Sequence, residues 1–182
     1  MGAAYAVVTA IGADRVGIVD DLSAAVLEAR CNIEESKMAV LGGDFAVIML
    51  VSGDESALGS LSRSCPSLGD RLGLRIECRS TGAPAPGPGR PYFLSAVSLD
   101  TPGIVHSLTA LLRRHRVNIE DLETDTAAAP WTGAPMFRMR AHVVVAPGVS
   151  LDELRAELAR LGHEHDLDVT LSPVFPAAER SG

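Results

Sequence analysis

One sequence pattern occurs twice in this chain of 182 residues, and the repeat limits the folds that the chain can adopt. Asp14–Val19 reads D-R-V-G-I-V, and Asp100–Val105, which starts 86 positions later, reads D-T-P-G-I-V. Each copy is followed at the same distance by the triplet Asn-Ile-Glu, at Asn32–Glu34 and at Asn118–Glu120. Repetition at a fixed period defines the unit of folding, and two copies are too few for a solenoid. The repeat therefore predicts two domains of the same fold.

The segment between the two copies is rich in proline and glycine. Thr81–Pro91 contains four prolines and three glycines among eleven residues, a composition that excludes a helix or a central strand and favours a semi-extended spacer. We therefore expect a first domain over residues 1–80, a linker over 81–91, a second domain over 92–176 and a tail over 177–182.

Hydrophobic spacing predicts the same order of elements (strand, helix, strand, strand, helix, strand) in each half of the chain. In the first half we expect strands over Tyr5–Ile11, Ile33–Leu41, Phe45–Val51 and Leu74–Arg79, and helices over Gly17–Arg30 and from Glu55, the second interrupted by Pro66. In the second half we expect strands over Tyr92–Leu99, Ile119–Thr126, Phe137–Ala146 and Val169–Val174, and helices over Gly103–His115 and Leu151–Leu161. Gly42 and Gly43 predict a tight hairpin turn, whereas the matching connection, Ala127–Pro135 with Trp131, is longer. The predicted fold class is α+β: two tandem ferredoxin-like βαββαβ domains, each with helices on one face of an antiparallel sheet.

Composition and charge restrict the class of protein. The formal net charge is -7, and acidic residues exceed basic ones in both halves, by 11 to 8 up to residue 91 and by 12 to 8 beyond it. This balance provides no basic face for phosphate groups, so we do not expect direct binding to DNA or RNA. No apolar run is long enough to span a membrane, and the three cysteines lack the spacing of a zinc or redox site. We expect a cytoplasmic protein with reduced thiols.

The repeated loops at Asp14–Gly17 and Asp100–Gly103 each join a predicted strand to a predicted helix. In one interpretation they are capping turns, in which a polar residue caps the helix and a glycine permits close packing. In the other, the exposed backbone N–H groups and the helix dipole bind a carboxylate. The spacing alone leaves both interpretations open.

Asn32 and Asn118 follow the first predicted helix of each half and precede the next strand. Asparagine is common at helix C-termini, where it tolerates the left-handed backbone region. Its side-chain amide also accepts a hydrogen bond from an ammonium group and donates one to a carboxylate, which suits a free amino acid. Both interpretations are open for these residues as well.

The pattern D-x-P-G-I-V, a helix and N-I-E within βαββαβ resembles the ACT domain, a regulatory module that commonly binds amino acids at an interface between two copies. Three segments of the first half, Thr9–Val19, Cys31–Ser36 and Phe45–Gly53, closely resemble the first ACT domain of the glycine cleavage system transcriptional repressors. The resemblance covers the whole first half and is mainly architectural over the second.

The resemblance implies a non-enzymatic regulatory protein that binds an amino acid or related small metabolite, with glycine and serine as candidates, through paired ACT domains. It also implies transcriptional regulation of glycine cleavage or amino-acid metabolism through a protein partner such as a transcription factor, without catalytic residues, metal or cofactor. The ligand-binding residues that it implies are Asp14, Arg15, Gly17, Asn32 and Ile33 in the first half, and Asp100, Thr101, Gly103, Asn118 and Ile119 in the second.

Two features differ from the family pattern. Val16 occupies the loop position that usually holds proline, which Pro102 keeps in the second loop, and the hairpin with Trp131 is longer than the motif needs. We therefore expect the two half-sites to differ in ligand binding.

Two alternatives belong to other classes of function. One is a constitutive oligomerisation module without a ligand. The other is an enzyme or a regulatory subunit of one, because similar ACT domains are fused to catalytic domains, as in formyltetrahydrofolate deformylase; here the repeat fills both halves, and no catalytic signature occurs. His163 and His165 lack a third metal ligand nearby. Because a four-stranded unit has open edges, we expect edge or face pairing between units and a homo-oligomer, most simply a homodimer.

Overall fold

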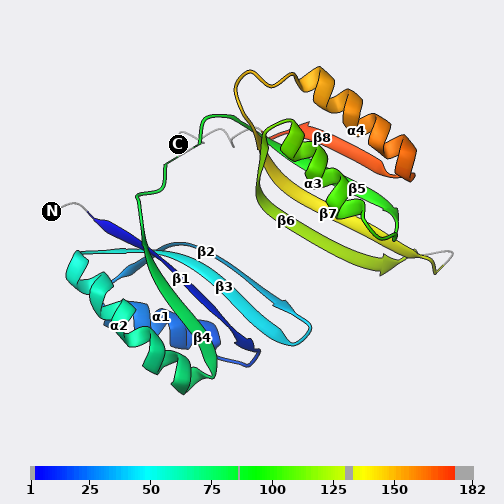
Figure 1. Ribbon diagram of the computed structural model, residues 1–182. Coiled ribbons are helices and arrows are strands. Elements are labelled where there is room, and N and C mark those ends of the chain that lie inside the picture. Colours follow the sequence, from blue (N-terminus) through cyan, green and yellow to red (C-terminus); the bar gives the residue numbers. More distant parts are fainter. Residues whose placement is uncertain (1–2, 86, 130–132, 175–182) are drawn as a thin grey trace, which may run out of the picture. The chain divides into compact units, whose positions relative to one another are not determined.

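The computed structural model describes residues 3–85, 87–129 and 133–174, which form two compact units, one reaching Ala85 and one following it (Figure 1). Over these residues each unit contains two helices and one four-stranded antiparallel sheet, in the order βαββαβ. The predicted α+β class with two ferredoxin-like repeats is therefore confirmed.

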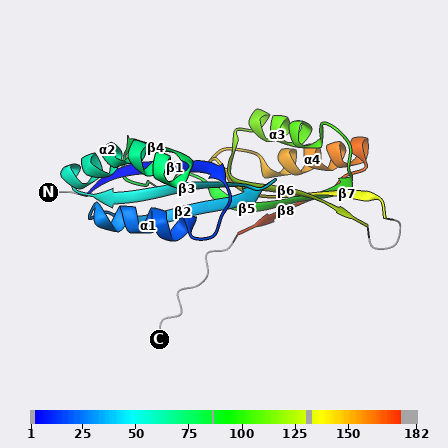
Figure 2. The same cartoon turned by 90° about the horizontal axis from the view of Figure 1, so that it is seen from below.

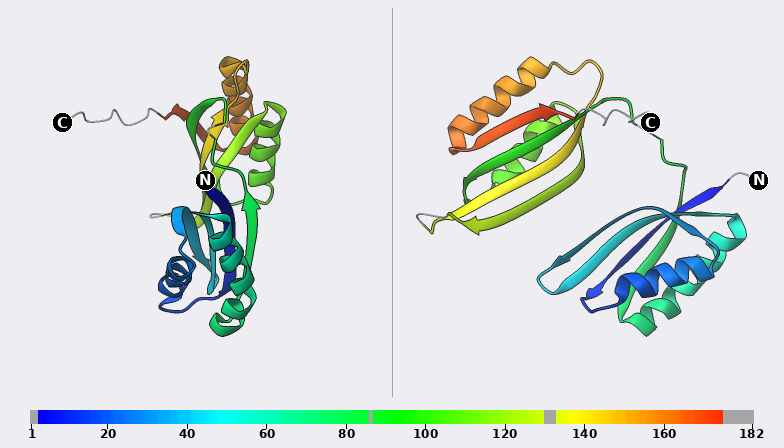
Figure 3. Two further views of the ribbon diagram at one scale, coloured as in Figure 1. Left: turned by 90° about the vertical axis from the view of Figure 1, so that its left-hand side faces the viewer. Right: turned by 180° about the vertical axis from the view of Figure 1, so that it is seen from behind.

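The first unit consists of β1 (Ala4–Ala13), α1 (Ile18–Glu28), β2 (Asn32–Leu41), β3 (Asp44–Gly53), α2 (Glu55–Leu72) and β4 (Leu74–Thr81). The strand order is β2-β3-β1-β4, so that β1 and β3 are central and β2 and β4 are edge strands. Alternate residues of the central strands, including Val8, Phe45 and Val51, are buried with the apolar sides of α1 and α2. Both helices lie on the same face of the sheet (Figure 3, right), and neither covers the opposite face.

The second unit repeats this arrangement with β5 (Arg90–Leu99), α3 (Ile104–Arg114), β6 (Val117–Ala128), β7 (Pro135–Val145), α4 (Leu151–His165) and β8 (Asp168–Pro173). Its strand order is β6-β7-β5-β8. Figure 2 shows α3 and α4 together on one side of this sheet. Leu94, Leu108 and Leu154, from β5, α3 and α4, are fully buried in the core between the two layers.

Pro66 lies inside α2 and does not interrupt the helix, contrary to the expectation from the sequence. An internal proline removes one backbone hydrogen bond and costs about 3 kcal/mol. Buried side chains continue beyond it, at Leu68 and Leu72. Burial of each leucine contributes about 1.5–3 kcal/mol, so the two together outweigh the cost of the proline.

The composition of Thr81–Pro91 does not exclude a central strand, because β5 begins at Arg90 and pairs Pro91 with Val144 of β7. Proline is tolerated there since it lies at the start of the strand, beyond the last β5–β8 pair, where no ladder donor is needed. The helix α4 is also longer than expected and includes His163 and His165 in its last turn. Trp131 lies outside the described residues.

Candidate functional site

The two repeated loops have the same backbone conformation. Gly17 and Gly103 are the N-cap residues of α1 and α3, with φ angles of 94° and 96°, a region that favours glycine. Neither helix has a side-chain cap, so the interpretation of Asp14 and Asp100 as capping residues is wrong. Their backbone N–H groups instead donate to a carbonyl oxygen of the neighbouring hairpin, at 2.9 Å in both loops. The first-turn N–H groups of both helices are thus left without a side-chain acceptor, as anion binding requires.

Charged side chains surround the N-terminus of α1. Arg15 Nη2 lies 2.8 Å from Asp21 Oδ2, and Arg15 Nη1 donates to the carbonyl oxygen of Val16 at 3.1 Å. Both Asp20 and Asp21 lie in the first turn of α1. Acidic side chains in a first turn already complement the helix dipole and repel a further carboxylate.

The N-terminus of α3 carries no acidic residue in its first turn. His106 and Ser107 stand where α1 has Asp20 and Asp21, and Thr101 stands where the first loop has Arg15. A side chain added at Gly103 would meet no atom within 4 Å. The second loop is therefore the more open and the electrostatically more favourable of the two for an anion.

The asparagines are strand residues and not helix caps. Asn32 is the first residue of β2 and Asn118 the second residue of β6, and both are exposed. The left-handed residues that follow α1 and α3 are Arg30 (φ 60°) and Arg116 (φ 55°). The C-cap interpretation is therefore wrong, because the helices end before the asparagines.

The Asn-Ile-Glu triplet marks a β-bulge in each edge strand. The register of β2 against β3 shifts between Ile33 and Glu35, and the register of β6 against β7 shifts between Ile119 and Asp121. A bulge leaves one residue unpaired and changes the direction of its side chain. Ile33 and Ile119 are half-buried and pack against the two cores, so their side chains have a structural role.

In the first unit the bulge places Glu34 in a polar network that the sequence did not identify. Its Oε1 accepts hydrogen bonds from Asn32 Nδ2 at 3.1 Å and from the hydroxyl of the buried Ser52. The hydrogen bond from Ser52, followed by that from Asn32, lowers the pKa of Glu34 below its usual value. Opposite Asn118 the second unit has Val144, which offers no hydroxyl, so the two asparagines have different surroundings.

Within one unit the structure does not bring the loop and the asparagine together. Asp14 bonds to the turn between β2 and β3, whereas Asn32 pairs with Ser52 at the opposite end of β3. The 11 residues of α1 lie between these positions. At 1.5 Å per residue such a helix spans about 16 Å, which is far longer than a free amino acid. A ligand cannot contact both positions of the same unit.

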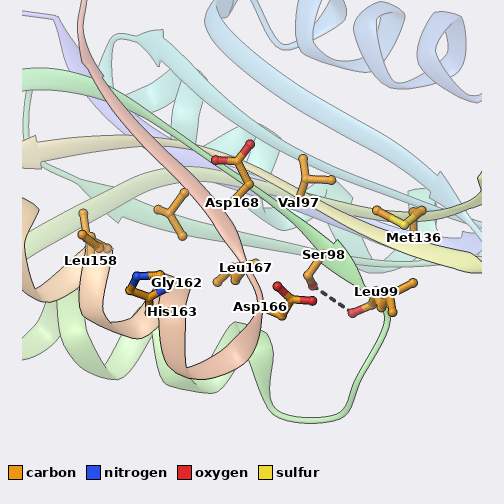
Figure 4. Close-up of a pocket in the computed structure, with 12 residues that line it drawn as sticks. Val97, Ser98, Leu99, Met136, Leu158, Gly162, His163, Asp166, Leu167 and Asp168 are labelled. Atoms are coloured by element: carbon orange, nitrogen blue, oxygen red, sulfur yellow. Dashed lines mark hydrogen bonds between the residues drawn. The ribbon is translucent and has the colours of Figure 1, made fainter.

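A hollow of about 710 Å³ opens in the second unit beside the second loop, among the end of β5, the start of β7 and the end of α4 (Figure 4). Ser98, which lines it two residues before Asp100, is buried and donates to the carbonyl oxygen of Leu99 at 2.8 Å. The corresponding residue of the first unit is Gly12, where a Cβ atom would lie 2.8 Å from the carbonyl oxygen of Gly73. The second unit thus accommodates a side chain where the first has room only for glycine.

Neither a metal site nor a membrane-spanning helix is present over the described ranges. The His, Cys, Asp and Glu side chains described there form no group of three or more that could hold a metal ion. In the same part of the chain, no helix is both long and apolar enough to cross a membrane.

Comparison with known proteins identifies the domain type. The family model of the ACT domain matches residues 4–79. The glycine cleavage system transcriptional repressor of Escherichia coli (strain K12) is 37% identical to this chain over 126 residues. The aligned segment covers 69% of this chain and 66% of the repressor, so the chain spans less than two thirds of the repressor's length.

Two solved structures share the fold of the whole chain. A protein described only as unknown, from Galdieria sulphuraria, has a TM-score of 0.80 with 35% identity and covers 96% of this chain and all of its own. A candidate glycine cleavage system transcriptional repressor has a TM-score of 0.73 with 24% identity, covering 96% of this chain and 99% of its own. The first unit is therefore an ACT domain, and the chain is a tandem ACT-domain protein that resembles the glycine cleavage system transcriptional repressor.

Proposed function

We propose that this chain is a non-enzymatic, cytoplasmic regulatory protein that binds a free amino acid, with glycine and serine as candidates. By the same proposal it regulates transcription in glycine cleavage or amino-acid metabolism through a protein partner such as a transcription factor. The observation that carries the proposal is the repeated loop, in which a left-handed glycine precedes a helix whose first N–H groups have no side-chain cap.

The ligand's carboxylate binds the exposed N–H groups at a helix N-terminus, and its ammonium binds the amide oxygen of an asparagine. In the first unit the carboxylate of Glu34 adds negative charge beside Asn32. Because these positions are about 16 Å apart in one unit, the site needs a second ACT unit whose first helix runs antiparallel. Antiparallel packing brings the N-terminus of one helix beside the C-terminal end of the other.

Among the carboxylate half-sites, the loop at Gly103 is the stronger, since α3 has no acidic residue in its first turn. Among the ammonium half-sites, Asn32 is the stronger, since Ser52 and Glu34 support it and Val144 replaces Ser52 opposite Asn118. The carboxylate half-site at Gly103 should therefore bind more tightly than the one at Gly17, and the ammonium half-site at Asn32 more tightly than the one at Asn118.

Regulation follows from binding by linkage. A ligand that prefers one arrangement of the ACT units increases the population of that arrangement, and thereby the population able to bind the partner. The acidic chain, with a net charge of -7, favours contact with a protein partner over direct contact with DNA.

A thermal-shift screen of the amino acids against Ser107 variants tests the proposal. A ligand at about 100 times its Kd stabilises the folded chain by about 2.7 kcal/mol, so the melting temperature should rise for glycine, serine or a close analogue. Ser107→Asp places a carboxylate where α1 has Asp21 and should reduce the shift, whereas the neutral control Ser107→Asn should keep it. A melting temperature that no amino acid changes would favour the ligand-free oligomerisation module instead.

A further inference from the structure

We propose that two copies of the chain associate face to face through the first sheet, on the face that α1 and α2 leave uncovered. We call this the outer face. Its residues are the ones on β1 to β4 whose side chains point away from the helices. The proposal concerns a different surface from the loops and Asn32, which lie at the ends of the strands.

The centre of the outer face is apolar. Ile11 of β1 and Ile48 of β3 are 48% and 50% exposed, and Val7 and Leu50, farther along the same two strands, are half-buried. The register pairs Val7 with Leu50, so the exposed apolar side chains come from the two central strands and adjoin one another. An apolar strip along the middle of a sheet face is typical of a surface that packs against another protein.

Charged residues lie on the two edge strands of the outer face. The strand register aligns them in rows with the residues of the central strands. One row contains Lys37, Ile48, Thr9 and Glu77, and the next contains Glu35, Leu50, Val7 and Arg79. Each of these two rows thus has opposite charges at its two ends, and the signs are reversed between them. This pattern is complementary to itself.

A twofold axis that runs parallel to the strands places the outer faces of two copies against each other, with each row opposite the same row of the other copy. It places the β2 edge of one copy over the β4 edge of the other, in the aligned packing that face-to-face sheets adopt. Lys37 then meets Glu77 of the partner subunit, and Glu35 meets Arg79 of the partner subunit. In the centre, the small Ala46 faces the large Ile11 of the partner subunit, the alternation of sizes that close packing requires.

These charge pairs cannot form inside one unit. Lys37 and Glu77 lie on opposite edge strands, three strand spacings or about 14 Å apart. Glu77 does have a neighbour on its own strand, since its Oε1 lies 3.7 Å from Arg75 Nε, but both side chains are more than 70% exposed. Lys37 and Glu77, like Glu35 and Arg79, can therefore come opposite each other only across two copies of the chain.

The outer face of the second sheet differs in a way that favours the first as the interface. There, charges on adjacent strands already pair within the unit: Arg140 lies 3.3 Å from Glu123, and Arg138 pairs with Asp125. These pairs cover β6 and β7 with neutralised polar groups. On the first sheet β3 instead has Ile48 and Leu50 at the places where β7 has Arg140 and His142.

The size of the outer face predicts a reversible association. Four strands about 4.8 Å apart and four rows about 6.8 Å apart give about 500 Å² per copy, or about 1,000 Å² in total, near the lower limit of specific interfaces. The dimer should therefore dissociate on dilution and weaken as salt screens its edge charges.

Sedimentation equilibrium of the full chain over a concentration series tests the proposal. The average molecular mass of the parent should exceed the 19.1 kDa of one chain and rise with concentration. Lys37→Glu and Glu77→Lys should each weaken the dimer at least about tenfold, because symmetry makes every altered contact occur twice and about 1.4 kcal/mol suffices for a tenfold change. The double variant Lys37→Glu/Glu77→Lys should restore the dimer to within about threefold of the parent, because the swapped charges are again complementary.

A matched control has the same change in composition but the wrong geometry. Lys37→Glu/Glu35→Lys swaps charges along one edge, which leaves like charges opposite both Glu77 and Arg79 of the partner subunit, so this variant should stay dissociated. Circular dichroism checks that each variant is folded. A parent chain that stays monomeric at every concentration, or rescue of Lys37→Glu by Glu35→Lys instead of Glu77→Lys, would overturn the proposal.

Discussion

Two glycines of α2 should respond in opposite ways to the same substitution. Gly59 and Gly69 lie in one helix, where alanine is normally more stable than glycine by about 0.8–1 kcal/mol. At Gly59 an added Cβ atom would meet only the end of the flexible Arg63 side chain, at 3.3 Å. At Gly69 it would lie 2.6 Å from the backbone carbonyl oxygen of Leu74. Only the second contact forces the backbone to move.

The expected magnitudes follow from these distances. Gly59→Ala should stabilise the first unit by about 0.5–1 kcal/mol, because helix propensity acts almost alone. Gly69→Ala should destabilise it by about 1–2 kcal/mol, because overpacking costs about 1–3 kcal/mol and the gain in propensity offsets part of that. Gly162 in α4 repeats the arrangement, with a Cβ atom 2.6 Å from the carbonyl oxygen of Leu167, and should behave like Gly69.

Urea denaturation followed by far-ultraviolet circular dichroism measures both changes. With a slope of about 1–3 kcal/mol per molar urea, the two variants should move the unfolding midpoint of the first unit in opposite directions. The reasoning would be refuted if Gly69→Ala proved as stable as Gly59→Ala, since the helix and strand would then not be in the close contact that the structure shows.

Three further predictions concern the site and the second core. Asn32→Ala should weaken amino-acid binding by about 10- to 100-fold, as expected for a lost hydrogen bond to a charged group, and Asn118→Ala should have a smaller effect. Equal effects of the two substitutions in calorimetry would argue against the role of Glu34 and Ser52 in supporting Asn32. Gly103→Ala should reduce amino-acid binding while leaving the chain folded, because a φ of 96° strains an alanine in the loop without causing a steric clash. A variant that binds the amino acid as tightly as the parent would exclude the α3 N-terminus as the carboxylate site. The hydrogen bond from His115, with the nearby Arg114, lowers the pKa of Glu157. The ionised Glu157 therefore stabilises the fold at pH values above the usual glutamate pKa of about 4.3, and this stabilisation is lost as the pH falls through the lower pKa of the folded state. Glu157→Gln should therefore show a shallower loss of melting temperature in acid than the parent, and identical acid profiles would exclude this linkage.

The types of element could be predicted from the sequence because burial imposes a period on each of them. Alternation along β1 and helical spacing along α4 follow directly from which face is covered. The interruption expected at Pro66 was wrong because tertiary burial of Leu68 and Leu72 decides where α2 ends. A local rule cannot include that contribution.

The candidate site was less accessible to sequence reasoning. The interpretation of the repeated glycines as residues that permit close packing was wrong, because an added Cβ atom would lie 3.7 Å from its nearest neighbour at Gly17 and would meet no atom within 4 Å at Gly103. What the two glycines share is a left-handed φ. The network of Glu34 depends on Ser52, which is 18 residues away in the chain and comes near only through the register of β2 against β3. Likewise, the separation of the loop from Asn32 along α1 becomes evident only when the helix is placed on the sheet.

The most direct test of the account is a calorimetric titration of the full chain with glycine and serine, alongside glycinamide and N-acetylglycine. Glycinamide lacks the carboxylate for the helix N-terminus, and N-acetylglycine lacks the ammonium for the asparagine. The account predicts saturable binding of at least one of the amino acids and none of either analogue. Absence of binding by both amino acids, or binding of the analogues as tight as that of glycine, would contradict it.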